Sequence, residues 1–331
     1  MSGAGNFLND MPKTYKTWAN GFRTLTETFY KKGPDYRQGI FNMETTNNLE
    51  DRDVEIGGIG EFEEWLEGQP APLDEVREGF EVKYRQYPYA KRVAFGRLAR
   101  KFYLENVRST KTMMTKMGTK AWELEQRSAF DLLSQGFSAT FNNGYGDGKR
   151  TFSGAHPLSP HDATTWSNVL TDSAVLSEAS LQALFTLLDT TPDDRGNEMH
   201  LGKYGYTIVV TNLQDYLAAQ RLVNVDADLR PGTANNDINV FSGKMVGMNR
   251  PITVTWVPYA ANATNPRAFY VLANQEHQLN VLTSESFNTD VYEDDASKTL
   301  FVRASLMFAV GLGSPRGIVA SLGDGTTTVN W

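Results

Sequence analysis

Histidine and aspartate residues come closest to forming a chemical site in one stretch of this chain. His156, His161 and Asp162 stand close together, and imidazole and carboxylate groups are ligands of metal-dependent hydrolases. Their spacing does not match H-E-x-x-H, in which two histidines share one face of a helix. Glycine and proline residues surround them, which favours an exposed loop without metal. A metal-dependent hydrolase is therefore kept only as the alternative from a different functional class.

Three other chemical patterns are incomplete. The run 146–150 lacks the spacing of a phosphate-binding P-loop, and 311–317 misses the dinucleotide fingerprint because Pro315 would stop the required helix. The chain has no cysteine, which excludes disulfides, thiolate metal sites and cysteine nucleophiles. No stretch matches G-x-S-x-G, the turn that carries a hydrolase serine. The sequence thus predicts a protein that is not an enzyme and that uses no cofactor or metal.

The composition indicates a folded and soluble protein. The 331 residues are 40% hydrophobic and 21% charged, which is enough apolar content for one or two large cores. The net charge of −7 argues against a protein that grips nucleic acid, although it is compatible with an acidic wall around nucleic acid. The first residues lack the apolar segment of a secretory signal, and no apolar run is long enough to cross a bilayer. We therefore expect synthesis in the cytosol and no membrane association.

The longest helical pattern, residues 106–137, is the element that must position the rest. Its apolar residues recur mostly at spacings of three and four, which places them on one face of a helix. Ser109 or Thr110 can cap its start, and Gly136 can end it. Such a helix would be roughly 40 Å long and would act as a spine for flanking sheets. The apolar stripe consists of Met113, Met114, Met117, Ala121, Leu124, Ala129, Leu132 and Leu133.

Residues 1–36 are expected to form an arm. Its four large apolar residues are spaced four, three and four apart, as on one face of a short helix that ends at Gly33-Pro34. The spacing alone leaves open whether this helix docks on its own domain or contacts another molecule. The four residues are Trp18, Phe22, Leu25 and Phe29.

An acidic hairpin is predicted between residues 44 and 96. Residues on both sides of the 68–72 bend alternate between apolar and charged types, which indicates two extended strands. Only Arg52 and Arg77 oppose the acidic residues from Glu44 to Glu81. A ribbon of two strands is marginally stable alone, so we expect this hairpin to lean on another surface. Its predicted contact residues are Glu61, Glu63, Glu64 and Glu67.

A basic stretch directly follows the hairpin and offers a surface of opposite charge. The acidic and basic sets can pair within one molecule, or between copies with the hairpin of one on the spine of the next. They can also be two unrelated solvated faces, as charge runs commonly are. The predicted basic contact residues are Arg97, Arg100, Lys101, Arg108 and Lys111.

The remainder of the chain predicts a mixture of helices and strands. A loop with little regular structure covers about 142–168, and Ser177 is the expected N-cap of the next helix. This layout is of the α+β class, with a compact domain at about 199–285 inserted into a second domain. Strands are expected at 206–210, 252–257, 269–272, 279–282 and 299–322, a helix at 213–223, and a polar loop at 226–239.

Five short stretches together resemble one protein family. They are similar to the major head, or capsid, subunits of tailed bacteriophages, especially those of the Mu-like type. The order of elements also matches along nearly the whole chain. The stretches are YRQGIFNMET (36–45), TFSGAHPL (151–158), DSAVLSEAS (172–180), PGTANNDIN (231–239) and SPRG (314–317).

The resemblance implies the Hong Kong 97 capsid fold and a structural function. The implied function is self-assembly through pentamers and hexamers into an icosahedral head around double-stranded DNA. Portal, scaffold or decoration proteins would be partners, and the protein would be part of a virion assembled in the host cytoplasm. The implied parts are an N-terminal arm (1–36), an extended hairpin loop with its strands (37–100), a peripheral domain with the spine (101–198 and 286–331) and an axial domain (199–285).

The resemblance also assigns contacts between copies. The arm residues would clasp another copy, and the polar loop would point toward the centre of a pentamer or hexamer. Residues 51–82 contain no lysine, so the covalent lock that some members of this fold form from a hairpin lysine is not expected. The nearest alternative, an encapsulin-like nanocompartment, shares the fold but encloses an enzyme. The implied contact residues of the axial loop are Asp226, Asp228, Arg230, Asn235 and Asn236.

Overall fold

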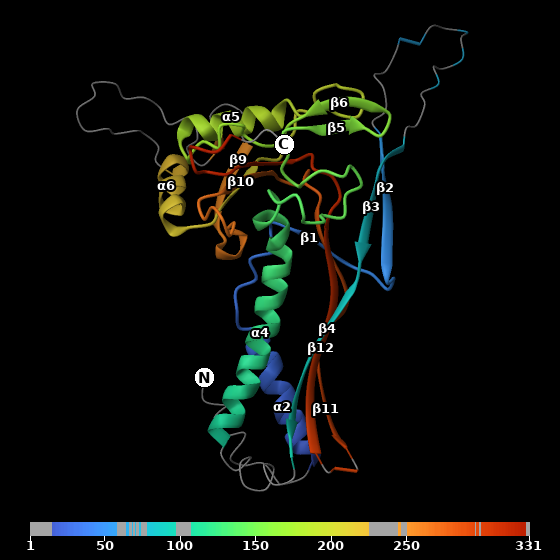
Figure 1. Ribbon diagram of the computed structural model, residues 1–331, viewed down its shortest axis with the longest axis vertical. Coiled ribbons are helices and arrows are strands. Elements are labelled where there is room, and N and C mark those ends of the chain that lie inside the picture. Colours follow the sequence, from blue (N-terminus) through green and yellow to red (C-terminus); the bar gives the residue numbers. More distant parts are fainter. Residues whose placement is uncertain are drawn as a thin grey trace, which may run out of the picture.

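The helix α4 (Val107–Ser134) is the axis of an elongated molecule, as the apolar stripe predicts. Figure 1 shows a wide head at one end of α4 and a narrow rod along the rest of it. No helix in the ranges given below is long and apolar enough to span a membrane. The computed structural model describes residues 15–57, 64, 65, 68, 70, 73, 78–96, 107–224, 244, 245, 250–294, 296, 297 and 299–328, with only the backbone for 15–19, 56, 107–110, 224, 244 and 245.

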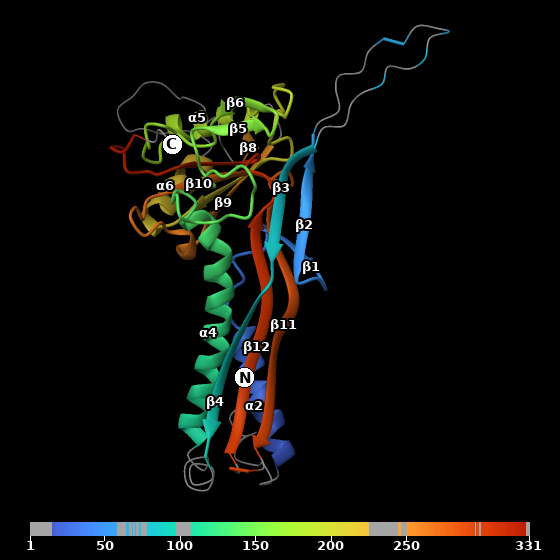
Figure 2. The ribbon, with the colours of Figure 1, turned by 45° about the vertical axis from the view of Figure 1, so that its right-hand side comes forward.

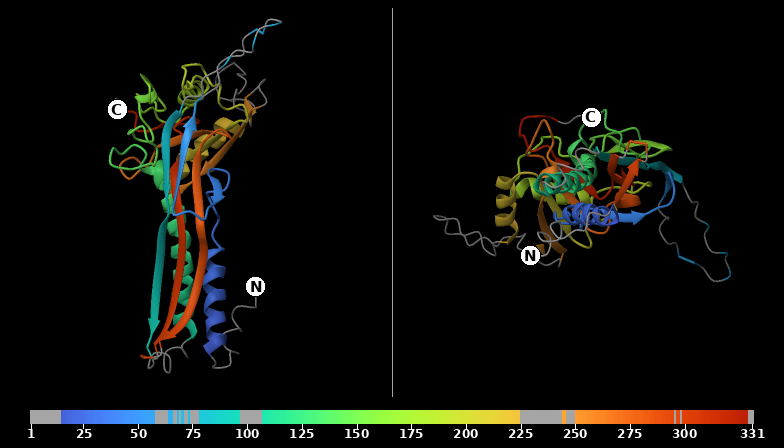
Figure 3. Two further views of the ribbon diagram at one scale, coloured as in Figure 1. Left: turned by 90° about the vertical axis from the view of Figure 1, so that its right-hand side faces the viewer. Right: turned by 90° about the horizontal axis from the view of Figure 1, so that it is seen from below.

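The rod is a sheet of four strands with two helices on one face. Its strand order is β1-β11-β12-β4, and β1 runs parallel to β11 while the other neighbours are antiparallel. Figure 3 shows α2 and α4 side by side along this sheet. Their apolar residues and those of β4 and β12 form one buried cluster, which explains why an amphipathic helix is stable here. The elements are α2 (Tyr15–Tyr30), β1 (Asn42–Thr45), β4 (Tyr87–Phe95), β11 (Leu279–Asp294) and β12 (Thr299–Leu312).

The head is a sheet of five strands between two layers of helix. The strand order is β13-β10-β7-β9-β8, and α5 and α6 cover one face through a buried apolar cluster. The carboxyl end of α4 covers the other face, where Phe130, Leu133 and Tyr270 share a second cluster. The elements are α5 (Glu178–Asp189), β7 (Tyr206–Val210), α6 (Leu213–Asn224), β8 (Lys244–Met245), β9 (Arg250–Trp256), the 3-10 turn η1 (Pro258–Ala260), β10 (Phe269–Ala273) and β13 (Ile318–Ser321).

The strand pairing differs from the predicted layout at two points. The sequence places the whole of 286–331 with the spine, whereas β13 pairs with β10 in the head sheet. The predicted strand 279–282 belongs to β11 in the rod, although it was expected in the compact domain. Both differences arise because β11 and β12 form one long hairpin that leaves the head and returns to it (Figure 2). The remaining domain boundaries stay predictions.

Two smaller hairpins join the head. β2 (Glu50–Ile56) pairs antiparallel with β3 (Glu78–Arg85), with Asp51 opposite Tyr84, and β3 continues past Gln86 into β4. The predicted hairpin is thus present, and we call β2 and β3 with the chain between them the hairpin. β5 (His156–Ser159) and β6 (Asp162–Trp166) form the second ribbon, where the sequence predicts only a loop. The sequence pattern did not indicate this ribbon, because Pro157 and Pro160 argue against strands. Thr164 and Thr165 are the β-branched residues that favour it.

Candidate assembly surfaces

The hairpin exposes large apolar side chains among acidic ones. Leu73 is 95% exposed and Trp65 is 68% exposed, although residues of this type are normally buried. Glu64 is exposed beside Trp65, while Glu61, Glu63 and Glu67 lie outside the described residues. The sequence carried a usable signal here, because large apolar residues occur inside an acidic run that contains glycine and proline. Such a surface is typical of a segment that binds another molecule.

An apolar groove runs along the rod between α4, β4 and β12. Its volume is about 500 Å³, and we call it the α4–β4 groove. Lys91, Lys116 and Lys120 belong to its lining, so the groove combines an apolar floor with positive charge. Lys116 and Lys120 are exposed, and Lys120 also pairs with Glu123 on its own helix. The apolar part of the lining is Tyr89, Ala90, Val93, Met113, Met117, Ala121, Leu124, Ala304 and Leu306.

The start of α4, which carries the predicted basic contact residues Arg108 and Lys111, lies at the far end of the rod from the hairpin. Lys111 is half-buried in the second turn of α4, and Arg108 is described by its backbone alone. Arg97, Arg100 and Lys101 lie outside the described residues. Figures 1 and 2 show the hairpin leaving the head, whereas α4 begins at the opposite end. Among the described residues, Glu64 of the hairpin and Lys111 of α4 therefore lie at different ends of the molecule.

The arm helix packs on its own chain, which corrects part of the predicted arm contact. Phe22 is fully buried and stacks on Phe95 of β4 with ring centroids 6.0 Å apart, and Leu25 is 6% exposed. These two residues are therefore unavailable to another copy. Phe29 is half-buried, and the side chain of Trp18 lies outside the described residues. The interpretation of a helix docked on its own domain holds for the described part of α2.

A buried ionic cluster fixes the arm to the spine. Glu125 of α4 accepts hydrogen bonds from the Tyr30 hydroxyl at 2.6 Å and from Arg37 at 3.1 Å. Burial raises the pKa of Glu125, and Arg37 and Tyr30 offset this only in part. Burial would also raise the pKa of Asp35, but hydrogen bonds from Arg37 and Gln126 bring it below its usual range. One arginine thus serves two carboxylates at the joint between arm and spine.

The candidate metal residues do not converge. His156 is 1% exposed, with Nδ1 2.7 Å from Asp147 Oδ2 and Nε2 3.2 Å from Asn168 Oδ1. His161 and Asp162 are exposed at the turn between β5 and β6, and Asp162 accepts the backbone N–H of Thr164. Within the described part of the chain, no three histidine, aspartate or glutamate side chains could hold a metal ion. The residues behind the hydrolase alternative therefore have separate, local hydrogen-bonding roles.

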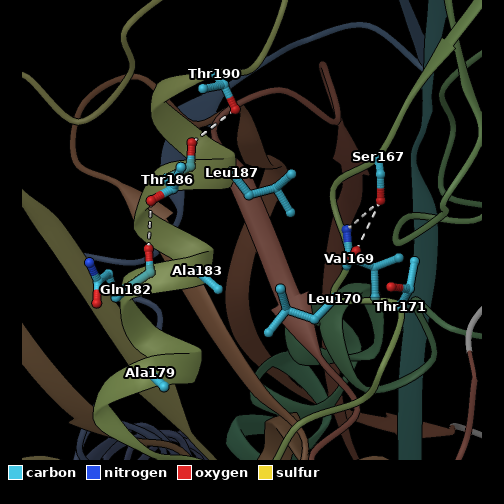
Figure 4. A pocket seen from close by; sticks show the side chains of 10 residues that line it. All are labelled: Ser167, Val169, Leu170, Thr171, Ala179, Gln182, Ala183, Thr186, Leu187 and Thr190. Atoms are coloured by element: carbon cyan, nitrogen blue, oxygen red, sulfur yellow. Dashed lines mark hydrogen bonds between the residues drawn. The ribbon is translucent and has the colours of Figure 1, made fainter.

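A second groove, of about 610 Å³, lies between α5 and residues 167–171. Figure 4 shows that small and uncharged side chains line it. The Ser167 hydroxyl donates to the Val169 carbonyl at 2.9 Å and accepts the Val169 N–H at 3.2 Å, so it satisfies the backbone at this edge. No titratable group lines this groove, and it offers no chemistry. The axial-loop residues Asp226, Asp228, Arg230, Asn235 and Asn236 lie outside the described residues.

Comparison with known proteins identifies the fold. No family model and no curated protein matches the chain. A solved structure from Mycobacterium phage Patience is similar over 99% of this chain and 90% of its own, with 12% identity and a TM-score of 0.51. A virus-like particle from Pyrococcus furiosus (12% identity, 92% of this chain and 98% of its own) and the capsid of Cyanophage P-SCSP1u (12% identity, 87% of each chain) both have a TM-score of 0.49. The spine, arm helix, long hairpin and two sheets make this the tailed-phage capsid fold, as predicted, while the Mu-like type stays a prediction.

Proposed function

We propose that this protein is the major capsid subunit of a tailed phage. Copies would assemble through pentamers and hexamers into an icosahedral head that encloses double-stranded DNA. The observation that carries this proposal is a pair of surfaces that lie on different parts of one chain. The exposed hairpin leaves the head (Figure 2), and the α4–β4 groove lies between elements of the rod. Two different, complementary surfaces on identical subunits produce head-to-tail contacts, and such contacts form rings when the rotation between neighbours closes.

The hairpin and the groove match in both charge and polarity. The hairpin brings exposed Trp65 and Leu73 together with Glu64, and the groove brings an apolar floor together with Lys116 and Lys120. The contact would place apolar side chains on the floor and carboxylates near the ammonium groups. This moves the predicted partner of the acidic hairpin from the start of α4 to its middle. Lys111, one turn before Lys116, would still lie within reach of an extended acidic segment.

The energetics favour many modest contacts over one strong contact. Burying a residue such as Leu73 contributes about 2 kcal/mol, and an exposed ion pair contributes about 0–1 kcal/mol. Each subunit in a ring would place its hairpin on one neighbour and bind the hairpin of the other neighbour in its groove. Repetition around a closed ring then converts weak pairwise contacts into a stable assembly. The ionic part of the contact should weaken with added salt, because exposed charges are screened.

Reversing the charges on both surfaces tests the contact. Glu63→Lys with Glu64→Lys should block shell assembly without changing the melting temperature of the monomer. Lys116→Glu with Lys120→Glu should do the same, and combining all four changes should restore shells. Electron microscopy and size-exclusion chromatography provide the measurement. Asp172→Lys with Glu198→Lys makes the same charge change elsewhere on the head and is the matched control.

Two results would contradict this proposal. Normal shells from the hairpin variant would show that the acidic residues do not contribute to assembly. Failure of the fourfold variant to assemble, with a normal melting temperature, would show that hairpin and groove are not partners. The content of purified shells then separates the two kinds of container. Nuclease-protected DNA supports a phage head, and a bound enzyme with its docking peptide supports the encapsulin-like alternative.

A further inference from the structure

Arg316 connects the hairpin to the head through a set of short contacts. It lies in the SPRG stretch between β12 and β13, and its guanidinium lies 2.8 Å from the Glu55 carboxylate of β2. The same group donates to the Pro192 and Leu158 carbonyls, each at 2.8 Å. It also lies over the ring of Trp166, 5.6 Å from the centroid. Four segments that are distant in sequence therefore meet at one side chain.

Glu55 is fully engaged on the hairpin side. Its Oε1 accepts from Arg316 and from the Ser314 hydroxyl at 3.2 Å, and its Oε2 accepts from the Tyr145 hydroxyl at 2.7 Å. The side chains of Arg316 and Glu55 are 8% and 19% exposed. Burial and the neighbouring Glu55 carboxylate raise the pKa of Tyr145, so this hydroxyl keeps its proton and remains a donor. We call Arg316 and Glu55 with these partners the hairpin pin.

The hairpin pin and the contacts of β3 hold different strands of the hairpin. β3 is held on the head by buried Val82 and Tyr84 as well as by the Lys83 N–H, which donates to the Gly144 carbonyl at 2.9 Å, whereas the pin holds β2. Between hairpin and head lies an open cleft of about 440 Å³, with Asp53 and Phe80 on one side and Asp194 and Met199 on the other. A ribbon held at one strand can rotate about it, whereas a ribbon held at both strands has a fixed direction. The pin thus supplies the second point of attachment.

We propose that Arg316 is a positioning residue that sets the direction in which the hairpin leaves the head. The direction in turn decides which part of a neighbouring copy the hairpin reaches, so this inference rests on the proposed function. A buried ion pair adds little net stability compared with apolar residues, and its better-attested role is to specify one arrangement. The pin also gives the SPRG stretch a physical meaning. Ser314 and Arg316 bind Glu55, and Gly317 has φ +82° in a bend that packs on the His277 backbone.

The direction of the hairpin can be measured without any assembly. The chain has no cysteine, so Glu78→Cys on β3 and Ala163→Cys on β6 introduce two exposed sites for spin labels. Pulsed electron resonance then gives the distance distribution between hairpin and head in the soluble subunit. Arg316→Met should broaden this distribution about twofold and lower the yield of closed shells about tenfold, because a mobile hairpin is no longer preorganised for its neighbour. The control is Arg303→Met, which removes an exposed arginine paired with Asp290 in the rod sheet.

The outcomes separate the pin from the proposed function. A distribution that stays narrow in Arg316→Met overturns the inference, and so does a broad distribution with normal shells. If the unsubstituted chain forms no shells, the proposed function fails while the distance measurement still decides the role of the pin. Should Arg316→Met fold poorly, Glu55→Gln replaces it, because this variant leaves the carbonyl contacts of Arg316 in place. A broadened distribution in Glu55→Gln with an unchanged melting temperature supports the positioning role.

Discussion

The arm and the hairpin both extend away from the head, but they treat their apolar residues in opposite ways. The arm helix buries Phe22 and Leu25 against β4, β12 and the spine of its own chain. The hairpin leaves Trp65 and Leu73 exposed. An apolar surface that is buried within the subunit serves the stability of that subunit, whereas one that stays exposed serves an encounter. The comparison assigns the described part of the arm to folding and, under the proposed function, the hairpin to assembly.

The polar anchors of the two extensions differ in the same way. At the arm, Arg37 is shared by Asp35 and Glu125, which leaves an excess negative charge in a buried place. At the hairpin, Arg316 binds a single carboxylate and two backbone carbonyls. The arm is also held by an apolar cluster, so its anchor is one contact among many. Among the described residues, the hairpin is held by an apolar cluster on β3 alone, through Val82 and Tyr84, and the pin is the polar anchor of β2 beside an open cleft.

The largest expected effect comes from comparing alanine substitutions at Phe22 of the arm and at Trp65 of the hairpin. Phe22→Ala should lower the free energy of unfolding by about 3–5 kcal/mol, because it leaves a cavity among fully buried side chains. Trp65→Ala should change the free energy of unfolding by less than about 0.5 kcal/mol, because an exposed side chain buries little surface when the chain folds. Urea unfolding of the soluble subunit measures both values.

Shell formation should respond in the reverse order. Trp65→Ala should prevent closed shells although the subunit is fully stable. Phe22→Ala subunits should form shells wherever temperature and buffer keep them folded. Equal losses of unfolding free energy in the two variants would remove the distinction between arm and hairpin. Normal shells from Trp65→Ala would remove the assembly role of the hairpin tip.

The sequence predicts the elements of this molecule better than their partners. The stripe on α4 and the N-cap of α5 follow from local spacing, and Ser177 and Ser180 do exchange the predicted type of capping hydrogen bonds. The packing partner of Phe22 could not be predicted, because an apolar helical face can pack either on a neighbouring copy or on its own chain. The role of Arg316 was equally hidden. Its partner Glu55 lies 261 residues away, and no local pattern reports such a contact.

Two buried groups of the molecule, His277 and Glu125, should respond to acid with opposite sign. Burial lowers the pKa of His277, which lies beside the SPRG stretch, from its usual 6.5 to about 4. Between these values the unfolded chain binds a proton that the folded chain does not, so stability falls as pH falls, by up to about 3 kcal/mol. Glu125 at the arm has a raised pKa, so the folded chain binds its proton first. Its contribution to stability therefore rises as pH falls through that folded pKa.

Two variants separate these contributions. The loss of unfolding free energy between pH 7 and pH 4.5 should shrink in His277→Gln, because the titrating imidazole is gone. The same loss should grow in Glu125→Gln, because the opposing gain is gone. Urea unfolding at both pH values gives this loss for the unsubstituted chain and for each of the two variants. A loss that is unchanged in His277→Gln would contradict a neutral buried imidazole, and a smaller loss in Glu125→Gln would contradict the sign at the arm.

The smallest effect tests how closely the arm lies on the spine. Gly118 is the only glycine inside α4, and a Cβ at this position would lie 2.3 Å from the Thr26 carbonyl oxygen of α2. Alanine favours the helix by about 1 kcal/mol over glycine, but here the obstacle is backbone, which cannot move aside as a side chain could. Gly118→Ala should therefore lower the unfolding free energy by about 1–3 kcal/mol, since the two helices must separate.

Gly96→Ala is the matched control for this substitution. Gly96 lies just after β4, where a Cβ meets nothing within 4 Å, so the same chemical change should leave stability nearly unaltered. Neither substitution should change the direction of the hairpin. The distance distribution between spin labels at Glu78→Cys and Ala163→Cys should therefore stay narrow in both variants. A stabilising Gly118→Ala would mean that α2 does not lie on the spine at this distance. The arm would then be free to leave its own chain, and its apolar face would again be available to a neighbour.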